Sequence, residues 1–363
     1  MSPVGSAGTT PARVLDADAH VIEPAGVFGP AHALDRNPMD LPATTPFVAC
    51  GGADLTDQWD HGFDAPSYLR AMDAQGIDAV VLYPSIGLFV PYQPELTPAE
   101  SLDACARYDD WVAQYCAHDE RRLAAVGIAP LADPERAAAE TRRAAGLGLV
   151  AMMARPNHLY GRNLGDRAYD PFYDALEETG LVLAVHEGLG LRGATIGRDR
   201  FESFALRHAC SHPLEQMAAM ASLVLDGALE RHPALRVAFL ESGTGWVPYW
   251  LARLDDHRAW MAGSETAGLT LSASEYFARQ CIVSSDPEDR LVASSVSALG
   301  AERIVWASDF PHPDAEFPGA VAEFCDHAGP LDQLALDAVL WTTPLRFYRL
   351  ESRFASGGLT TTA

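Results

Sequence analysis

Three stretches of the chain decide its fold: Arg13-Val-Leu-Asp-Ala-Asp-Ala-His20, Gly180-Leu-Val-Leu-Ala-Val-His186 and Arg303-Ile-Val-Trp-Ala-Ser-Asp309. Each is a short apolar run that ends in an ionisable side chain. A fourth stretch, Arg236-Val-Ala-Phe-Leu-Glu241, ends in a carboxylate. Strands buried on both faces of a parallel sheet are continuous apolar runs. The four stretches therefore indicate buried strands that each place an ionisable group at one end.

Similar runs recur along the chain, and helical patterns separate them. We predict strands at Arg13–His20, Asp78–Tyr83, Leu123–Pro130, Leu149–Ala154, Leu181–His186, Val237–Glu241, Cys281–Ser284 and Ile304–Ala307. The predicted helices are Ala99–His118, Pro134–Ala145, Asp170–Thr179, Pro213–Arg231, Trp246–Ala262 and Pro287–Leu299. This alternation predicts an α/β fold, a (β/α)8 TIM barrel with a long insertion after the first strand. A doubly wound open sheet is the rival, but the glycine-rich turn that it would carry after an early strand is missing from the sequence.

The pattern predicts one domain. Residues 1–12 form a flexible leader, residues 13–351 a single barrel domain and residues 352–363 a flexible tail. Within the barrel domain, residues 24–66 are rich in Pro, Gly and Asp and lack periodicity. A loop of that length in a compact domain is usually functional, so we expect a lid over the barrel mouth.

Composition limits the possible partners. The 363 residues carry a formal net charge of −23, which argues against nucleic acid because phosphate would be repelled. No apolar run has the length that a membrane span needs. The six cysteines form no CxxC pair, which favours free thiols in a reducing compartment. We therefore expect a cytoplasmic protein that acts on a small molecule, without a nucleic-acid or membrane partner.

The ionisable strand ends predict a metal site. In a (β/α)8 barrel, residues from several strand ends converge at the mouth. Alternate residues of a strand share a face, so Asp16, Asp18 and His20 should point into the barrel together. Taken singly, Asp18 and His20 could cap a strand end, and His186 could be a satisfied core residue. Together with Asp309, they form a set of imidazoles and carboxylates that suits a divalent metal.

Longer motifs extend through almost the whole chain in order. They include Asp16-Ala-Asp-Ala-His-Val-Ile-Glu-Pro24, Val185-His-Glu-Gly188, Ser211-His-Pro-Leu-Glu-Gln216, Glu241-Ser-Gly-Thr-Gly-Trp-Val-Pro-Tyr-Trp250 and Ser308-Asp-Phe-Pro-His312. In these motifs the chain resembles the amidohydrolase superfamily, specifically the branch that includes aminocarboxymuconate-semialdehyde decarboxylase and the resorcylate decarboxylases. The resemblance implies a mononuclear metal site with Asp18, His20 and His186 as ligands and Asp309 as ligand or base. It also implies a homodimer.

One position departs from the pattern of these relatives. Many decarboxylases of the family carry a catalytic His at the end of the sixth strand, where this chain has Glu241. A carboxyl group would need a raised pKa to act as an acid at neutral pH. His212 and His312 are the imidazoles that we expect to compensate, although each could instead be a surface or capping residue.

Other residues of the sequence have alternative interpretations. Arg155 follows the fourth strand and could anchor a substrate carboxylate, or it could form a structural salt bridge. The aromatic residues Trp246, Tyr249 and Trp250 favour a core or a subunit interface. The remaining histidines have no distinguishing context and are expected to be surface or packing residues: His32, His61, His118, His158, His208, His232, His257 and His327.

The leading functional hypothesis is a metal-dependent hydrolase. Zn2+, or alternatively Mn2+, would activate a water for attack on a small organic substrate at a C–N, C–O or C–C bond. Asp309 would take the proton of the water, and Glu241 or His212 would protonate the leaving group. One alternative is a metal-dependent decarboxylase of an aromatic or enoic acid. A second alternative is a non-catalytic binding barrel.

Overall fold

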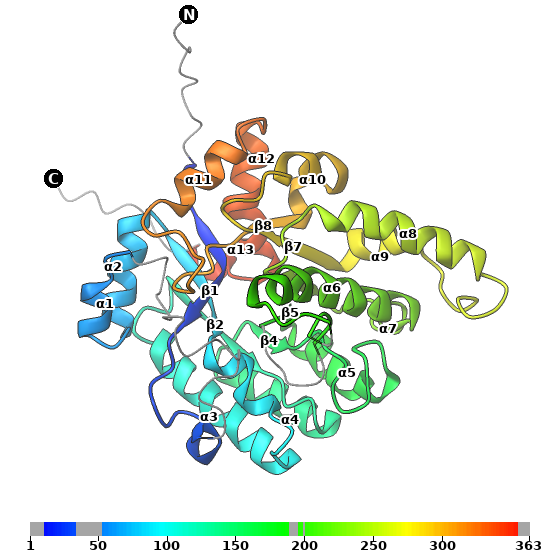
Figure 1. Cartoon of the computed structure of the whole chain (residues 1–363), viewed down its shortest axis with the longest axis horizontal. Helices are drawn as coiled ribbons and strands as arrows, with labels where there is room; N and C mark the ends of the chain where they lie inside the picture. The colour runs from blue at the N-terminus through cyan, green and yellow to red at the C-terminus, as the bar shows by residue number, and fades with distance from the viewer. Residues whose placement is uncertain (1–10, 34–52, 189–194, 199, 355–363) are drawn as a thin grey trace, which may run out of the picture.

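The computed structural model describes residues 11–33, 53–188, 195–198 and 200–354. Eight parallel strands pair in the order β1-β2-β3-β4-β5-β6-β7-β8 and lie at the centre of Figure 1, with helices around them. The strands are β1 Leu15–Val21, β2 Ala79–Pro84, β3 Leu123–Ile128, β4 Ala151–Ala154, β5 Val182–His186, β6 Val237–Leu240, β7 Cys281–Ser285 and β8 Ile304–Trp306. Just beyond β8, the Asp309 amide donates to the Asp18 carbonyl at 3.0 Å, and the His20 amide donates to the Phe310 carbonyl at 2.7 Å. The predicted TIM barrel is confirmed.

Helices follow the strands and cover the outside of the barrel. The α-helices are α1 Thr56–Asp60, α2 Ala65–Gln75, α3 Pro98–Cys116, α4 Pro134–Gly146, α5 Asp170–Thr179, α6 Phe204–Leu225, α7 Ala228–Arg231, α8 Trp246–Trp260, α9 Ala273–Gln280, α10 Val292–Leu299, α11 Ala320–His327, α12 Gln333–Asp337, α13 Thr343–Phe347 and α14 Glu351–Phe354. Short 3-10 helices are η1 Gly29–Ala33, η3 Ile86–Leu88, η4 Val90–Tyr92, η5 Arg167–Tyr169 and η6 Ala301–Arg303, and η7 Ala338–Thr342 is a π-helix. All eight strands are buried along their whole length, which explains why the sequence shows them as continuous apolar runs.

Helix α6 differs from its prediction in a way that matters for the site. The sequence rules start this helix at Pro213, because proline lacks an amide hydrogen and suits a first turn. The structure instead starts α6 at Phe204 and continues it through Pro213. The Gln216 side chain donates to the carbonyls of Val185 at 2.8 Å and Leu240 at 3.0 Å, which fixes α6 against the ends of β5 and β6. Tertiary contacts therefore override the local preference and add more than two turns before Pro213.

Helix α9 was missing from the prediction. It is short, and it begins with a capping box in which the Ser272 hydroxyl accepts from the Glu275 amide and the Glu275 carboxylate accepts from the Ser272 amide. The spacing S-x-x-E is a sequence signature of a helix start. This signal could have located the helix.

Parts of the predicted domain limits lie outside the described residues. The insertion after β1 is present, and η1 and α1 belong to it. Residues 34–52, most of the predicted lid, are outside the described part of the chain, as are residues 1–10 and 355–363. The first residues of the predicted tail are helical, because α14 extends to Phe354, whose ring packs against Trp341 at 5.0 Å between centroids.

The described residues bear on two predictions, the lack of a membrane span and the free thiols. No helix among the described residues is long and apolar enough to cross a membrane. Free thiols are found at all five cysteines in the described ranges, Cys105, Cys116, Cys210, Cys281 and Cys325, whereas Cys50 lies outside them.

Gly165 offers a test of how tightly α6 is held. Its amide donates to the Ser222 hydroxyl at 2.8 Å, and a Cβ at this position would lie 2.2 Å from the Ser222 carbonyl oxygen. That oxygen belongs to the backbone of α6 and cannot rotate away. We expect Gly165→Ala to lower the free energy of unfolding by about 1–3 kcal/mol, the usual cost of overpacking. Urea denaturation measures the change, with Gly146→Ala as the control, because a Cβ there meets nothing within 4 Å. Equal stability of the two variants would contradict the packing described.

Candidate active site

The structure brings three of the four residues predicted as metal ligands, Asp18, His20 and His186, into one cluster, and Asp309 lies next to it beside His20. Asp18 and His20 come from β1, His186 ends β5 and Asp309 follows β8. The Asp18 carboxylate lies 3.4 Å from His186 Nε2 and 3.7 Å from His20 Nε2, and the Asp309 carboxylate lies 3.0 Å from His20 Nε2. The convergence follows from the topology, since parallel strands of a closed barrel present their carboxyl ends at one mouth.

The inward-facing atoms of this cluster fit a divalent metal. Asp18 Oδ1, His20 Nε2 and His186 Nε2 are buried and have no hydrogen-bond partner among the described residues. A buried polar atom left without a partner costs about 1–3 kcal/mol, so several together call for a ligand. The outer nitrogens of the two imidazoles are occupied: His20 Nδ1 donates to the Pro84 carbonyl at 2.8 Å, and His186 Nδ1 donates to the Glu187 carbonyl. These bonds place the proton on Nδ1 and leave a lone pair on each Nε2, as a metal ligand requires.

Asp16 behaves differently from Asp18 and His20. The register of β1 against β2 shifts between Asp16 and Ala19, so the strand is not regular here. The Asp16 carboxylate accepts from the amide and the hydroxyl of Ser308. Burial raises the pKa of Asp16 to about 8, although the bonds from Ser308 oppose that shift. Asp16 therefore links β1 to the segment after β8 and lies behind the ligand cluster.

Two carboxylates of the site sit in a strained backbone conformation. Glu241 has φ of 51° and Asp309 has φ of 56°, in the left-handed region that residues other than glycine rarely adopt. The Glu241 amide donates to the Ser284 hydroxyl at 3.0 Å, which helps to hold this conformation. Such conformations persist where the surroundings fix them, and they cluster at functional sites.

His312 supports Asp309. Its Nδ1 lies 2.8 Å from the Asp309 carboxylate, its Nε2 lies 3.1 Å from the Ser85 hydroxyl, and its ring stacks on His20 at 3.8 Å between centroids. Burial alone would lower the pKa of His312, but Asp309 outweighs burial and raises it to about 9. Burial would likewise raise the pKa of Asp309, and the two imidazoles hold it below its usual range.

Glu241 pairs with His212. Glu241 Oε1 lies 3.3 Å from His212 Nε2, and Glu241 Oε2 lies 3.6 Å from His186 Nδ1. Burial opposes the charged form of His212, but Glu241 outweighs it and raises the His212 pKa to about 9. Burial likewise opposes ionisation of Glu241, while His212 brings the Glu241 pKa down to about 2. At neutral pH the pair is therefore an imidazolium beside a carboxylate, and Glu241 lacks the raised pKa that an acid of its own would need.

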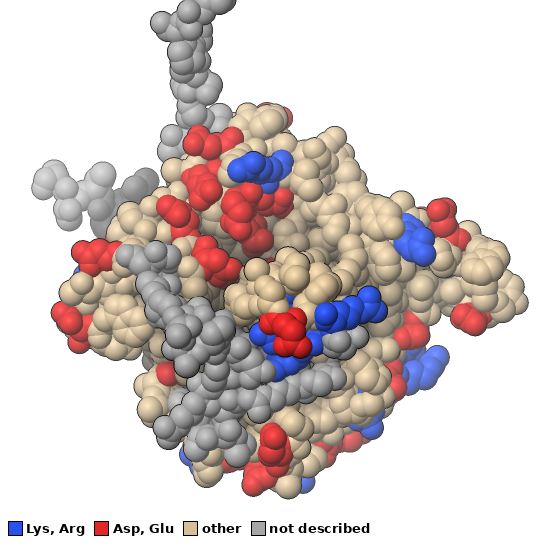
Figure 2. Space-filling model, in the orientation of Figure 1, with Lys and Arg blue, Asp and Glu red and all other residues tan. Residues whose placement is uncertain are grey.

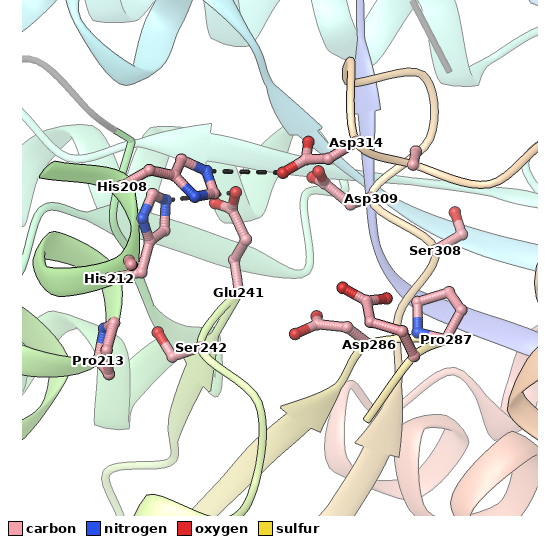
Figure 3. A pocket seen from close by; sticks show the side chains of 13 residues that line it. His208, His212, Pro213, Glu241, Ser242, Asp286, Pro287, Ser308, Asp309 and Asp314 are labelled. Atoms are coloured by element: carbon pink, nitrogen blue, oxygen red, sulfur yellow. Dashed lines mark ion pairs between the residues drawn. The ribbon is translucent and has the colours of Figure 1, made fainter. Parts of the chain in front are cut away.

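A cavity opens beside this pair, and Figure 3 shows the side chains that line it. The lining residues with ionisable side chains are His208, His212, Glu241, Asp286, Glu288, Asp309 and Asp314. His208 reaches Asp314 at 3.5 Å, and its ring lies 4.7 Å from that of His212. His208, Asp286 and Asp314 were missed in the sequence. His208 lies one helical turn before His212, Asp286 comes directly after β7, and Asp314 lies five residues beyond Asp309. These positions could have identified the three residues in the sequence.

The cavity is acidic. Its lining includes carboxylates and, among the described residues, neither Lys nor Arg. Figure 2 shows Asp and Glu side chains gathered in groups over this face of the molecule, in keeping with the net charge of −23. Burial and neighbouring carboxylates such as Glu288 hold the pKa of Asp286 well above its usual value. A cavity with this lining attracts cations and neutral molecules more readily than anions.

Arg155 is fully engaged within the protein. It is completely buried, and its guanidinium donates to Glu187 at 3.0 Å, to Asn157 at 3.0 Å and to the Leu88 carbonyl at 3.2 Å. It is absent from the lining of the cavity. This geometry favours the structural salt bridge over the substrate anchor.

We predict that Arg155→Met lowers the free energy of unfolding by about 3–5 kcal/mol, because it leaves the Glu187 charge buried without its partner. Thermal or urea denaturation checks this, and Glu187→Gln in the same background should restore part of the loss. A variant with unchanged stability and a raised KM would instead assign Arg155 to substrate binding.

The aromatic stripe on α8 divides into two parts. Trp246 is buried and packs edge-on against Phe239, and Trp250 Nε1 donates to the Met217 carbonyl at 2.8 Å. Tyr249 is 62% exposed. Helix α8 projects from the body of the barrel in Figure 1. Trp246 therefore belongs to the core, and the expected subunit interface stays a prediction.

The parallel barrel and the imidazoles and carboxylates at its strand ends assign the chain to a class, the metal-dependent barrel enzymes. Within that class, the chain belongs to the Amidohydrolase family, whose model matches residues 15–350. The match spans nearly all of the described residues and includes every predicted ligand.

Named relatives and solved structures agree with this assignment. The chain is 24% identical over 230 residues to 2-amino-3-carboxymuconate-6-semialdehyde decarboxylase of Dictyostelium discoideum, a match that spans 62% of each chain and so less than two thirds of that relative. It is 23% identical over 252 residues to gamma-resorcylate decarboxylase of a Rhizobium species, covering 67% of this chain and 75% of the relative. The solved structure of 5-carboxyvanillate decarboxylase from Sphingomonas paucimobilis superposes with a TM-score of 0.73 at 23% identity, over 93% of this chain and 99% of that one. A dihydroxybenzoic acid decarboxylase from Polaromonas, solved with bound manganese and 2-nitroresorcinol, has a TM-score of 0.71 at 17% identity and covers 94% and 99% of the two chains.

Proposed function

We propose that the chain is a metal-dependent decarboxylase of a small aromatic or enoic carboxylic acid. The relatives and solved structures named above are decarboxylases, which favours this activity over the hydrolysis that the sequence placed first. Family membership and the complete set of ligand-type residues leave the non-catalytic barrel without support.

The observation that carries the proposal is the pairing of His212 with Glu241 at the mouth of the barrel. Decarboxylation breaks the bond between carbon and CO2, leaves the electron pair on the carbon and needs a proton to replace the carboxyl group. The pair holds one transferable proton at neutral pH, because Glu241 raises the His212 pKa to about 9. It would supply the acid for which the family resemblance implies a His at the end of the sixth strand.

The strand-end cluster supplies the other half of the chemistry. Asp18, His20, His186 and Asp309 would hold a divalent ion, which would supply positive charge to offset that of the substrate carboxylate. We infer Mn2+ before Zn2+, because three of the solved decarboxylase structures contain manganese. Glu241 lies 3.6 Å from His186, so the pair of His212 and Glu241 is next to the strand-end cluster.

One observation favours hydrolysis as the second candidate. The cavity lining contains carboxylates and, in the described part of the chain, neither Lys nor Arg, so a neutral substrate would meet less repulsion than a carboxylic acid. A hydrolase of this kind would use Asp309 as the base toward water.

A substrate panel separates the two activities. Protein loaded with Mn2+ is assayed with carboxylated phenols on one side and with amides, lactones and cleavable diketones on the other. We expect CO2 release from at least one carboxylated phenol, with no turnover of the second group. Turnover confined to amides, lactones or diketones would overturn the proposal. The expected homodimer is tested separately by light scattering after gel filtration.

A further inference from the structure

A second group of metal-type side chains lies next to the strand-end cluster. His208 and His212 are four residues apart on α6, so both lie on one face of the helix, and their rings are 4.7 Å apart. Glu241 approaches from the end of β6, with Oε1 at 3.3 Å from His212 Nε2. One ligand atom from each of His208, His212 and Glu241 lies within 4.8 Å of the other two. Figure 3 shows the three side chains pointing toward one another across the edge of the cavity.

This arrangement of side chains resembles a common transition-metal binding motif in proteins. Two His one turn apart on a helix, completed by a carboxylate from another element, form a set of three protein ligands. Such a set leaves a fourth position for a water or another ligand, and His208, His212 and Glu241 all line the cavity. Glu241 Oε2 is buried and has no hydrogen-bond partner among the described residues. Asp314, 3.5 Å from His208 Nε2, adds a second carboxylate at the rim.

We propose that His208, His212 and Glu241 form a second metal site, suited to Zn2+ or a similar divalent transition metal. Imidazole nitrogens and a carboxylate oxygen suit such ions, whereas Mg2+ and Ca2+ prefer oxygen ligands alone. The His208 side chain is 35% exposed, which gives an ion a route from solvent. None of these three residues belongs to the strand-end set of Asp18, His20, His186 and Asp309.

The two sites are connected through Glu241. Its Oε1 faces His212, while its Oε2 lies 3.6 Å from Nδ1 of His186, whose other nitrogen faces the strand-end cluster. An imidazole nitrogen that binds a metal cannot also hold a proton. Occupancy of the second site would therefore remove the transferable proton of the pair and inhibit the enzyme, a consequence that rests on the proposed function.

Metal binding tests the site without any assay of activity. Apoprotein prepared with a chelator is titrated with Zn2+ in a calorimeter, and bound metal is counted after gel filtration. We expect two ions per wild-type chain and one per chain in His208→Ala and in His212→Ala, with the second-site affinity lowered more than about 100-fold, because even residues behind a ligand change affinity about 10–100-fold. His186→Ala should lose the strand-end ion and keep the second. The control His118→Ala removes an exposed imidazole and should keep both.

One ion per wild-type chain, or a second ion bound equally well by His208→Ala, would overturn the second site. The part-exposed His208 keeps the test valid if His212→Ala fails to fold. For the inhibitory consequence, Zn2+ is added to Mn2+-loaded enzyme, and inhibition is expected in wild type and not in His208→Ala. Two bound ions without inhibition would uphold the site and contradict the proton-donor role of His212, so the two proposals fail separately.

Discussion

Protein with His186→Ala is expected to contain one metal ion fewer per chain than wild type and to lose its activity. His186 is fully buried at the end of β5, and its Nε2 faces the Asp18 carboxylate at 3.4 Å with no hydrogen-bond partner among the described residues. Removing a ligand should cost more than the roughly 10–100-fold in affinity that residues behind a ligand contribute. Metal analysis by mass spectrometry after dialysis measures the loss.

The matched control is His118→Ala, which removes an exposed histidine that is distant in sequence from the predicted ligands. It should keep the full metal content and activity. If His186→Ala kept its metal while folding normally by circular dichroism, His186 would not belong to the ligands, and the arrangement of the site would need revision.

The second large effect is expected for Glu241→Gln. The change is nearly isosteric, and Glu241 is not assigned to the strand-end ligands, so that metal ion should be retained. Turnover should fall by about 10²–10⁴-fold, the usual contribution of one positioned acid or base. The pH profile should change as well, which a purely structural role would not cause.

The direction of that change follows from the charges around His212. In wild type, Glu241 keeps His212 protonated up to its pKa of about 9, so activity should persist to that pH and fall above it. In Glu241→Gln the counter-charge is gone, and the pKa returns toward or below the ordinary value of about 6.5. The residual activity should then decline from about that pH, measured as kcat/KM between neutral and alkaline pH.

An unchanged turnover in Glu241→Gln would transfer the proton role to His312. Loss of the strand-end ion would show that Glu241 is itself a ligand there. Glu241→His is informative in the same series, because the family resemblance implies a His at this strand end. If Glu241→His lost the native reaction and instead decarboxylated a different acid, the residue at this position would determine which acid is decarboxylated.

The strands and the ligand cluster were predictable because both depend on local patterns. Buried parallel strands appear as apolar runs such as Leu181–His186, and the barrel topology then brings the ends of β1, β5 and β8 to one mouth. Asp18, His20 and His186 therefore lie together and Asp309 lies beside His20, while their role as metal ligands stays a prediction.

The rest of the site depends on features that local patterns miss. The start of α6 is set by contacts of Gln216 with β5 and β6, and only a helix extended to Phe204 brings His208 beside His212. The ionisation of Glu241 depends on its neighbour His212 from another element, so its lowered pKa could not be inferred from the strand end alone.

On the proposed function, the chain removes CO2 from its substrate and replaces it with a proton. The most direct measurement is turnover of an active carboxylated phenol in D2O and, separately, in water enriched in 18O, followed by mass spectrometry of the product. We expect one deuterium on the carbon that carried the carboxyl group and no 18O in the organic product. A product that contains 18O from water, with no deuterium at that carbon, would contradict it and establish hydrolysis.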